Sequence, residues 1–103
     1  MTTRIRDHVC VLLLLLTGCG GYGDVSYTTY RYAQALYSIT NRRAAEKLDQ
    51  VTTQIDSARS SGQLSKREAR WLEEIIADAR EGNWQHANLA CRTMMEDQVK
   101  NTP

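Results

Sequence analysis

Phenylalanine is absent from this chain of 103 residues, and its only proline is the last residue, Pro103. Proline breaks a helix in its interior, so the lack of internal proline leaves the whole chain free to form helices. Ala, Leu, Glu, Arg and Gln are frequent, and these residues favour helix. The composition therefore predicts an all-α fold, and the length allows one small domain with a marginal core.

The chain also lacks an excess of either charge sign. It has 13 basic and 12 acidic residues. Two of the basic and one of the acidic residues fall in the first 18 positions, so 11 of each remain beyond them, interspersed along the sequence. Phosphate binding requires a basic face, and an electrostatic membrane anchor requires a basic run. The charge pattern argues against nucleic acid as a partner and against a polybasic membrane segment.

Residues 1–18 have the organisation of a secretory signal. Arg4 and Arg6 form a positively charged start, and residues 9–16 form an apolar run that includes Cys10. A membrane-spanning helix needs about 20 apolar residues, so this run is too short to be one. It has the length of the apolar region of a signal peptide.

The end of this segment, Leu16-Thr17-Gly18-Cys19, resembles the lipobox of bacterial lipoproteins. The resemblance implies that signal peptidase II recognises Leu16, Thr17 and Gly18 and cuts before Cys19. It also implies that Cys19 carries a covalent diacylglycerol and an acyl chain such as palmitate, and no other cofactor. In a Gram-negative host, Gly20 implies the periplasmic face of the outer membrane. The alternative is an ordinary secretory signal cut at a small residue among 18–23.

Residues 19–26 are interpreted as the lipidated cysteine and a flexible glycine-rich tether. All five tyrosines lie between residues 22 and 37, and Tyr27, Tyr30 and Tyr37 share one helical face. They suit either a belt at the level of lipid headgroups or a surface that packs on the domain. Packing is the favoured interpretation, and a short extended stretch within 25–32 is a further alternative.

Residues 27–99 are predicted to form a small helical domain, in which one long helix over 30–58 precedes a helical hairpin. The long helix has an apolar seam with spacings of four and three, made of Ala44, Leu48, Val51, Ile55 and Ala58. Continued towards the N-terminus, the same stripe meets Asn41, Tyr37, Gln34 and Tyr30. The polar Asn41-Arg42-Arg43 interrupts it, so the helix is expected to kink or restart near Thr40. The seam also suits self-association.

The hairpin has clear local signals. Gly62 is placed for a left-handed helix cap, and Ser65-Lys66-Arg67-Glu68 has the pattern of a capping box. Gly82-Asn83 predicts the turn between the two helices, and residues 100–103 are expected to fray. The two apolar faces consist of Ala69, Leu72, Ile75, Ile76 and Ala79, and of Trp84, Ala87, Cys91, Met94 and Met95. Residues 71–94 resemble one helix-turn-helix unit of the tetratricopeptide type, which implies the hairpin geometry alone.

No residue pattern predicts catalysis or a metal site. Cys91 is the only cysteine after Cys19, and its apolar neighbours favour a buried thiol over one that pairs with another chain. His86 is the only histidine beyond the leader, and its spacing from Cys91 does not place the two together on a helix. Trp71 and Trp84 are candidates either for a small groove or for packing.

The sequence thus favours a lipid-anchored protein of the cell envelope, not an enzyme, whose helical domain binds an envelope protein or itself. The mature region is similar to small uncharacterised helical lipoproteins of bacteria, which implies no particular activity. The second hypothesis is direct action on the membrane or envelope layer through Tyr27, Tyr30 and Tyr37. A small ligand-binding or enzymatic envelope protein is the third.

Overall fold

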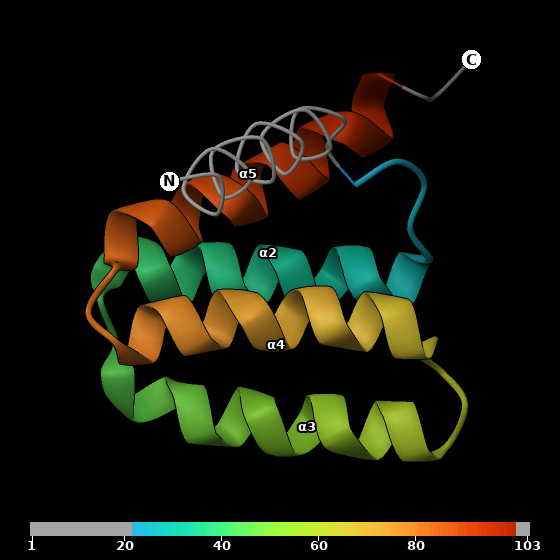
Figure 1. The fold of residues 1–103 in the computed structure, drawn as a ribbon, viewed down its shortest axis with the longest axis horizontal. Coiled ribbons are helices and arrows are strands. Elements are labelled where there is room, and N and C mark those ends of the chain that lie inside the picture. The colour runs from blue at the N-terminus through green and yellow to red at the C-terminus, as the bar shows by residue number, and fades with distance from the viewer. Residues whose placement is uncertain (1–21, 101–103) are drawn as a thin grey trace, which may run out of the picture.

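The computed structural model describes residues 22–100 of the chain. The predicted signal peptide, Cys19 and residues 101–103 lie outside this range. All regular structure in the described range is helical, which confirms the all-α class (Figure 1). The elements are α2 (Tyr27–Arg42), the short 3-10 helix η1 (Ala45–Lys47), α3 (Leu48–Ser60), α4 (Lys66–Arg80) and α5 (Trp84–Lys100).

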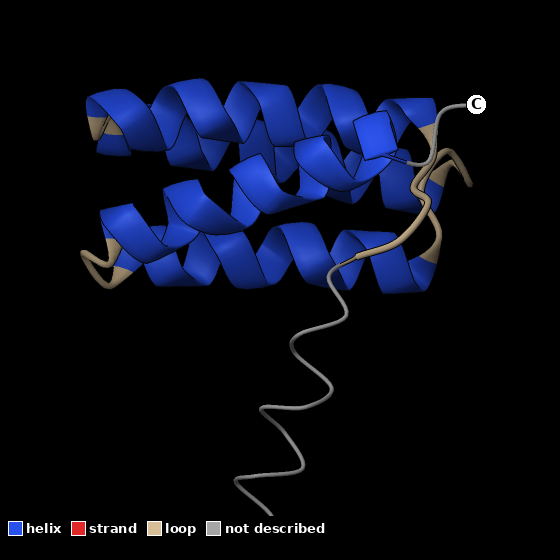
Figure 2. Cartoon of the chain, turned by 90° about the horizontal axis from the view of Figure 1, so that it is seen from above, coloured by secondary structure: helices blue, strands red, loops and turns tan. Residues whose placement is uncertain are grey.

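The four long helices lie side by side, and each runs antiparallel to the one before it (Figures 1 and 2). α2 packs most extensively on α5, and α4 packs on both α5 and α3. α2 and α4 are also in contact with each other, so they form the middle of the bundle. One end of the bundle therefore holds the starts of α2 and α4 together with the ends of α3 and α5.

The expected single helix over 30–58 is divided into two antiparallel helices. α2 ends at Arg42, and Arg43 has the left-handed backbone conformation with φ 51°. The amide of Arg43 then donates to the carbonyl of Thr40, and the amide of Ala44 donates to the carbonyl of Ile39 at 2.9 Å. These two bonds form a Schellman motif, which satisfies the last carbonyls of α2 and reverses the chain. The helix restarts close to the predicted position, but in the opposite direction.

The apolar seam over 44–58 is confirmed, since all five of its residues are buried. Its extension into α2 is wrong. Asn41 and Gln34 on that extended stripe are exposed. The buried face of α2 instead consists of Thr29, Ala33, Leu36, Ile39 and Thr40. The helical phase cannot be carried across Arg43, because the left-handed residue and η1 rotate the start of α3 relative to α2.

The hairpin of α4 and α5 agrees closely with the prediction. All five predicted residues of the α4 face are buried, and so are Ala87, Cys91 and Met94 on α5. Gly62 and Gly82 both have positive φ, 83° and 87°, and each occupies the left-handed position of a Schellman motif. Only glycine adopts this conformation without steric cost, which is why these two turns could be located in advance.

One continuous core joins the four helices. Leu36, Ile55 and Leu72, from three different helices, are fully buried within it. Half-buried aromatic side chains cover its edges, namely those of Tyr22, Tyr32, Tyr37, Trp71 and Trp84. Within the described residues, every helix falls short of the length and apolar character that a membrane span requires.

Candidate functional site

The predicted processing and lipidation residues Leu16, Thr17, Gly18 and Cys19 precede the described range. The first described residue, Tyr22, is three positions after Cys19. The surroundings of Tyr22 therefore form the part of the structure nearest to the predicted lipid. This part is called the entry end of the bundle, and it comprises residues 22–26, the first turns of α2 and α4, the ends of α3 and α5, and the turn between α3 and α4.

Residues 22–25, which the sequence places in a flexible tether, are hydrogen-bonded to the last turns of α5. The amide of Tyr22 donates to Oδ2 of Asp97 at 2.8 Å, and the amide of Val25 donates to Oε1 of Gln98 at 3.0 Å. Nε2 of Gln98 donates in turn to the carbonyl of Gly23 at 2.6 Å. Two side chains of α5 thus satisfy three backbone groups of the segment. Tyr22 and Val25 also pack against the core, so the segment is bound to the bundle at its described positions.

Glu68 connects this segment to α4. The predicted capping bond at the start of α4 is present, because the amide of Glu68 donates to Oγ of Ser65 at 3.1 Å. In a capping box the Glu68 side chain would also accept from the amide of Ser65. Here the Glu68 side chain binds a residue far away in the chain instead. The carboxylate of Glu68 accepts from the amide of Ser26 at 2.7 Å and from its Oγ at 3.1 Å. Ser26 is itself the N-cap of α2, since its Oγ accepts from the amide of Thr29.

The buried Glu68 is therefore part of the capping of two helices. Its own amide is capped by Ser65, while its carboxylate binds the residue that caps α2. Glu68 is only 7% exposed, and a buried carboxylate requires such partners. Its negative charge at the start of α4 is also favoured by the helix dipole.

Aromatic and cationic side chains cover the outside of the entry end. The ring of Tyr22 meets that of Trp71 edge to face, with centroids 5.1 Å apart. The guanidinium of Arg67 lies over the same Trp71 ring at 5.0 Å. Burial, and then the nearby Cys91, Glu74, Asp78 and Asp97, raise the pKa of Tyr22, so the phenol stays neutral against the indole. Trp71 thus belongs to the edge of the core and forms the base of this aromatic cluster.

The three tyrosines predicted to share a face have different surroundings. Tyr37 packs against the core, and Tyr30 is partly buried. Tyr27 is 72% exposed, and its hydroxyl accepts from Nη1 of Arg31 at 2.9 Å. The packing interpretation therefore describes Tyr37, whereas Tyr27 projects from the first turn of α2 at the entry end.

The opposite end of the bundle, called the far end, has a shallow open hollow beside the turn between α4 and α5. Its lining residues are Arg43, Gly82, Asn83, Trp84, Gln85, His86 and Leu89. Leu89 is 57% exposed, and Trp84 is half-buried. Nδ1 of His86 lies 2.6 Å from Oδ2 of Asp78, which holds the imidazole at the rim. The hollow combines apolar and cationic groups.

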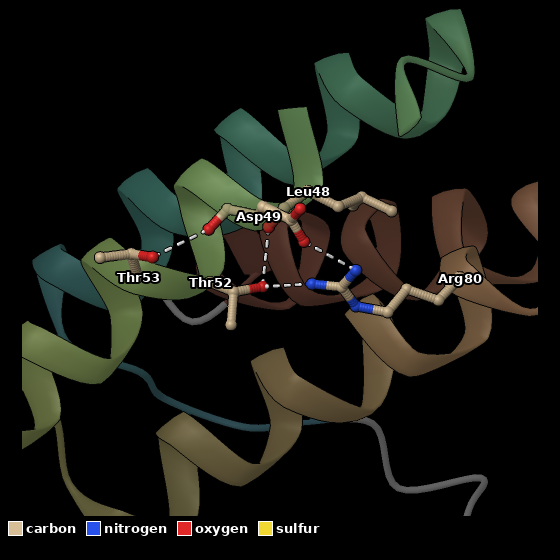
Figure 3. A network of polar contacts seen from close by, with 5 residues as sticks. All are labelled: Leu48, Asp49, Thr52, Thr53 and Arg80. Atoms are coloured by element: carbon tan, nitrogen blue, oxygen red, sulfur yellow. Dashed lines mark hydrogen bonds and ion pairs between the residues drawn. The ribbon is translucent and has the colours of Figure 1, made fainter. Parts of the chain in front are cut away.

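Exposed polar contacts connect α3 to α4 near this far end (Figure 3). Nη1 of Arg80 lies 2.9 Å from Oδ1 of Asp49, and Nη2 of Arg80 donates to Oγ1 of Thr52 at 3.2 Å. Thr52 and Thr53 donate to the carbonyls of Leu48 and Asp49, one turn earlier in α3. The Asp49 side chain is 87% exposed, so solvent screens this ion pair.

Cys91 is buried, as its place on the apolar face of α5 predicted. Burial raises the pKa of its thiol to about 12, although a hydrogen bond with Thr40 opposes part of this shift. Thr40 also accepts from Nδ2 of Asn88 at 3.0 Å and donates to the carbonyl of Leu36. A protonated thiol inside the core is a poor nucleophile and is not presented to a second chain.

The residues that sequence reasoning missed are Ser26, Asp97 and Gln98, together with the second role of Glu68. Their contacts span 42 to 75 positions in the chain. No local pattern indicates such pairs, because capping and turn signals involve residues within about four positions.

Metal-ligating side chains do not gather in groups of three or more among the described residues. The remaining polar groups of the entry end can bind backbone, hold charge and contact a polar surface.

No protein-family model matches the sequence, and no curated protein or solved structure is significantly similar to it.

Proposed function

We propose that the protein is a lipid-anchored component of the cell envelope and acts as a helical interaction module without catalytic activity. In this proposal residues 1–18 are removed, Cys19 carries the lipid, and the bundle faces the periplasm from the outer membrane. One acyl chain binds a membrane only marginally, so a cysteine with several chains provides the stable anchor that such a module needs.

The observation that supports this most is the binding of residues 22–26 to α4 and α5. Only Gly20 and Gly21 separate Cys19 from Tyr22. Three residue steps span at most about 11 Å, so the lipid would hold the entry end close to the membrane surface. A short connection of this kind suits a module that acts at a defined distance from the membrane.

The partner surface in this proposal is the hollow at the far end, which includes the predicted interaction residue Trp84. Leu89 is one of two large apolar side chains that are well exposed among the described residues. It lies beside Arg43 and His86 in the lining of the hollow. This combination suits a protein partner that offers an apolar side chain next to a carboxylate. By contrast, the apolar seam of α3 faces the core and is not available for self-association.

The test is photo-crosslinking of the lipidated full chain in its own envelope. A photoreactive residue replaces Leu89, and a matched control carries it at the exposed Gln50 on α3. We expect a specific protein adduct from position 89 that is absent from position 50 and lost in the Cys19→Ala variant. Equal labelling from both positions, or labelling that survives without the lipid, would contradict the proposal. Mass spectrometry of the Cys19 peptide reports the lipid directly.

The second candidate, direct action on the membrane layer, has one specific observation in its favour. Tyr27 is exposed at the entry end, and tyrosine side chains suit the level of the headgroups. Replacing Tyr27 alone by Ser leaves the core aromatic Tyr37 in place, so this variant separates a membrane role from a folding role. Loss of envelope function with an unchanged thermal midpoint would favour this candidate over the interaction module.

A further inference from the structure

The entry end carries three exposed basic side chains on the first turns of α4: Lys66, Arg67 and Arg70. Within the part of the chain that the structure describes, none of the three takes part in an ion pair. Lys66 and Arg67 occupy the first two positions of the helix, where the helix dipole disfavours positive charge. The positive charges of Lys66 and Arg67 are therefore unfavourable for the helix on which they lie, although Arg67 also contacts the ring of Trp71.

Most acidic side chains of the same end already have partners. Glu68 binds Ser26, Asp97 binds the amide of Tyr22, and Glu73 and Asp56 both pair with Arg59. Asp24 and Glu74 are exposed acids of this region for which no ion pair is found among the described residues. Lys66, Arg67 and Arg70 lie within five positions of the sequence, and Glu68 between them turns inward to Ser26, so the outward surface of the first turns of α4 carries the three cations.

A shallow hollow at this end adds a second feature. Its lining residues are Arg59, Ser60, Leu64, Lys66, Arg70 and Glu73, with three cations and one acid among them. On the neighbouring face of α4, the guanidinium of Arg67 lies over the ring of Trp71. A cation beside an amphipathic aromatic ring suits the headgroup level of a membrane.

We propose that this basic surface, defined by Lys66, Arg67 and Arg70, rests on the anionic phospholipid headgroups of the membrane that holds the Cys19 lipid. The proposal rests on the proposed function, because the lipid places this end next to the membrane. Anionic headgroups are the proposed partner for two reasons. The connection from Cys19 to Tyr22 is short, and the negative headgroups complement the three positive side chains. The surface orients the bundle, so that the hollow beside Leu89 points away from the membrane.

The test uses the lipidated full chain on vesicles of phosphatidylcholine, with and without phosphatidylglycerol. A fluorophore is attached either to Gln63→Cys at the entry end or to Gln85→Cys at the far end, while the buried Cys91 remains unlabelled. A headgroup-linked quencher reports how close each position lies to the membrane. We expect quenching at position 63 that requires phosphatidylglycerol and weakens at high salt, and little quenching at position 85.

The variant with Lys66, Arg67 and Arg70 all replaced by Gln should lose the quenching at position 63. Its matched control replaces Arg42, Arg43 and Lys47 at the far end by Gln, which changes the net charge equally, and should retain it. Each cation near an anionic surface contributes about a fivefold factor in binding, so without the lipid the first variant should bind phosphatidylglycerol vesicles at least about tenfold more weakly than the control. Its thermal midpoint should change little, because the loss of two charges that oppose the helix dipole offsets the loss of the contact between Arg67 and Trp71.

Equal quenching at the two positions, or equal behaviour of the two triple variants, would overturn the inference. Quenching at position 63 that is insensitive to phosphatidylglycerol and salt would overturn it as well. Failure of the proposed function has a different signature, namely an unmodified Cys19 peptide. The unlipidated Cys19→Ser chain then provides a separate measurement. Because it retains residues 1–18, the contribution of the basic surface is the salt-sensitive binding to phosphatidylglycerol that it loses when Lys66, Arg67 and Arg70 are replaced by Gln.

Discussion

The two ends of the bundle are held together by different kinds of contact. At the entry end, the buried Glu68 and the side chains of Asp97 and Gln98 bind backbone groups of residues 22–26. At the far end, a local backbone turn closes each helix pair, and the ion pair that joins α3 to α4 is exposed. A lost buried hydrogen bond costs more than a lost exposed ion pair, so the entry end depends on particular side chains and the far end on local backbone geometry.

The largest effect should come from Glu68→Ala. This variant removes the acceptor of two hydrogen bonds from Ser26, and it leaves the N-terminus of α2 without its link to α4. We expect a loss of about 2 kcal/mol in the free energy of unfolding, measured by urea denaturation and circular dichroism. Glu68→Gln retains one oxygen and should lose less. A Glu68→Ala variant as stable as the native chain would show that the two ends do not differ.

Ser65→Ala tests the local cap at the same end. The side chain of Ser65 accepts from the amide of Glu68, and removing such an N-cap costs about 1 kcal/mol. Ser65→Asp supplies another good capping group and should stay within a few tenths of a kcal/mol of the native stability. If the alanine and aspartate variants were equally unstable in the same denaturation experiment, the hydroxyl could not be acting as a cap.

At the far end, Arg43→Gly should stabilise the protein. Arg43 has φ 51°, which disfavours any residue with a Cβ, whereas Gly62 and Gly82 occupy the equivalent positions of the other two turns. Relief of this strain should raise the free energy of unfolding by roughly 0.5–1 kcal/mol. Arg42→Gly, one residue earlier in the helix, should instead lower it. Thermal midpoints of the two variants that move in the same direction would contradict this view of the turn.

The smallest effect should come from Asp49→Ala, which removes the ion pair with Arg80. Both side chains are substantially exposed, so the expected loss is below about 0.5 kcal/mol and should vanish at high salt. The free energy of unfolding of Asp49→Ala and of Glu68→Ala, measured in the same series of salt concentrations, compares the two ends of the bundle directly. A salt-independent loss as large as that of Glu68→Ala would reverse the contrast.

The hairpin of α4 and α5 could be predicted almost completely from the sequence. Gly62, Ser65 and Gly82 act through their nearest neighbours, and the apolar spacing after them identifies the buried faces. The buried face of α2 was harder to predict, because its tyrosines suggested a different apolar stripe. The pattern of Ala33, Leu36 and Ile39 was present in the sequence, but the seam of α3 was extended across Arg43 in its place.

The candidate site was less accessible to sequence reasoning. Trp71 and Tyr27 were identified as interaction candidates, and the structure places both at the entry end, with Tyr27 exposed and Trp71 beneath Arg67. The lipobox with Cys19 stays a prediction, since it precedes the described residues. Lys66, Arg67 and Arg70 are close together in the sequence, but only the structure places them at the same end of the bundle as residues 22–26.

The sequence by itself determined the helical class, two of the three reversals of the chain and the apolar faces over 44–58, 69–79 and 84–95. Each of these depends on residues within a few positions of one another, so propensity, capping and periodicity suffice. Only the tertiary structure decided that α2 and α3 are antiparallel, that Glu68 binds Ser26, and that Asp97 and Gln98 hold residues 22–25 against the bundle. These contacts join positions 42 to 75 residues apart, and such pairs become neighbours only when the core brings the helices together.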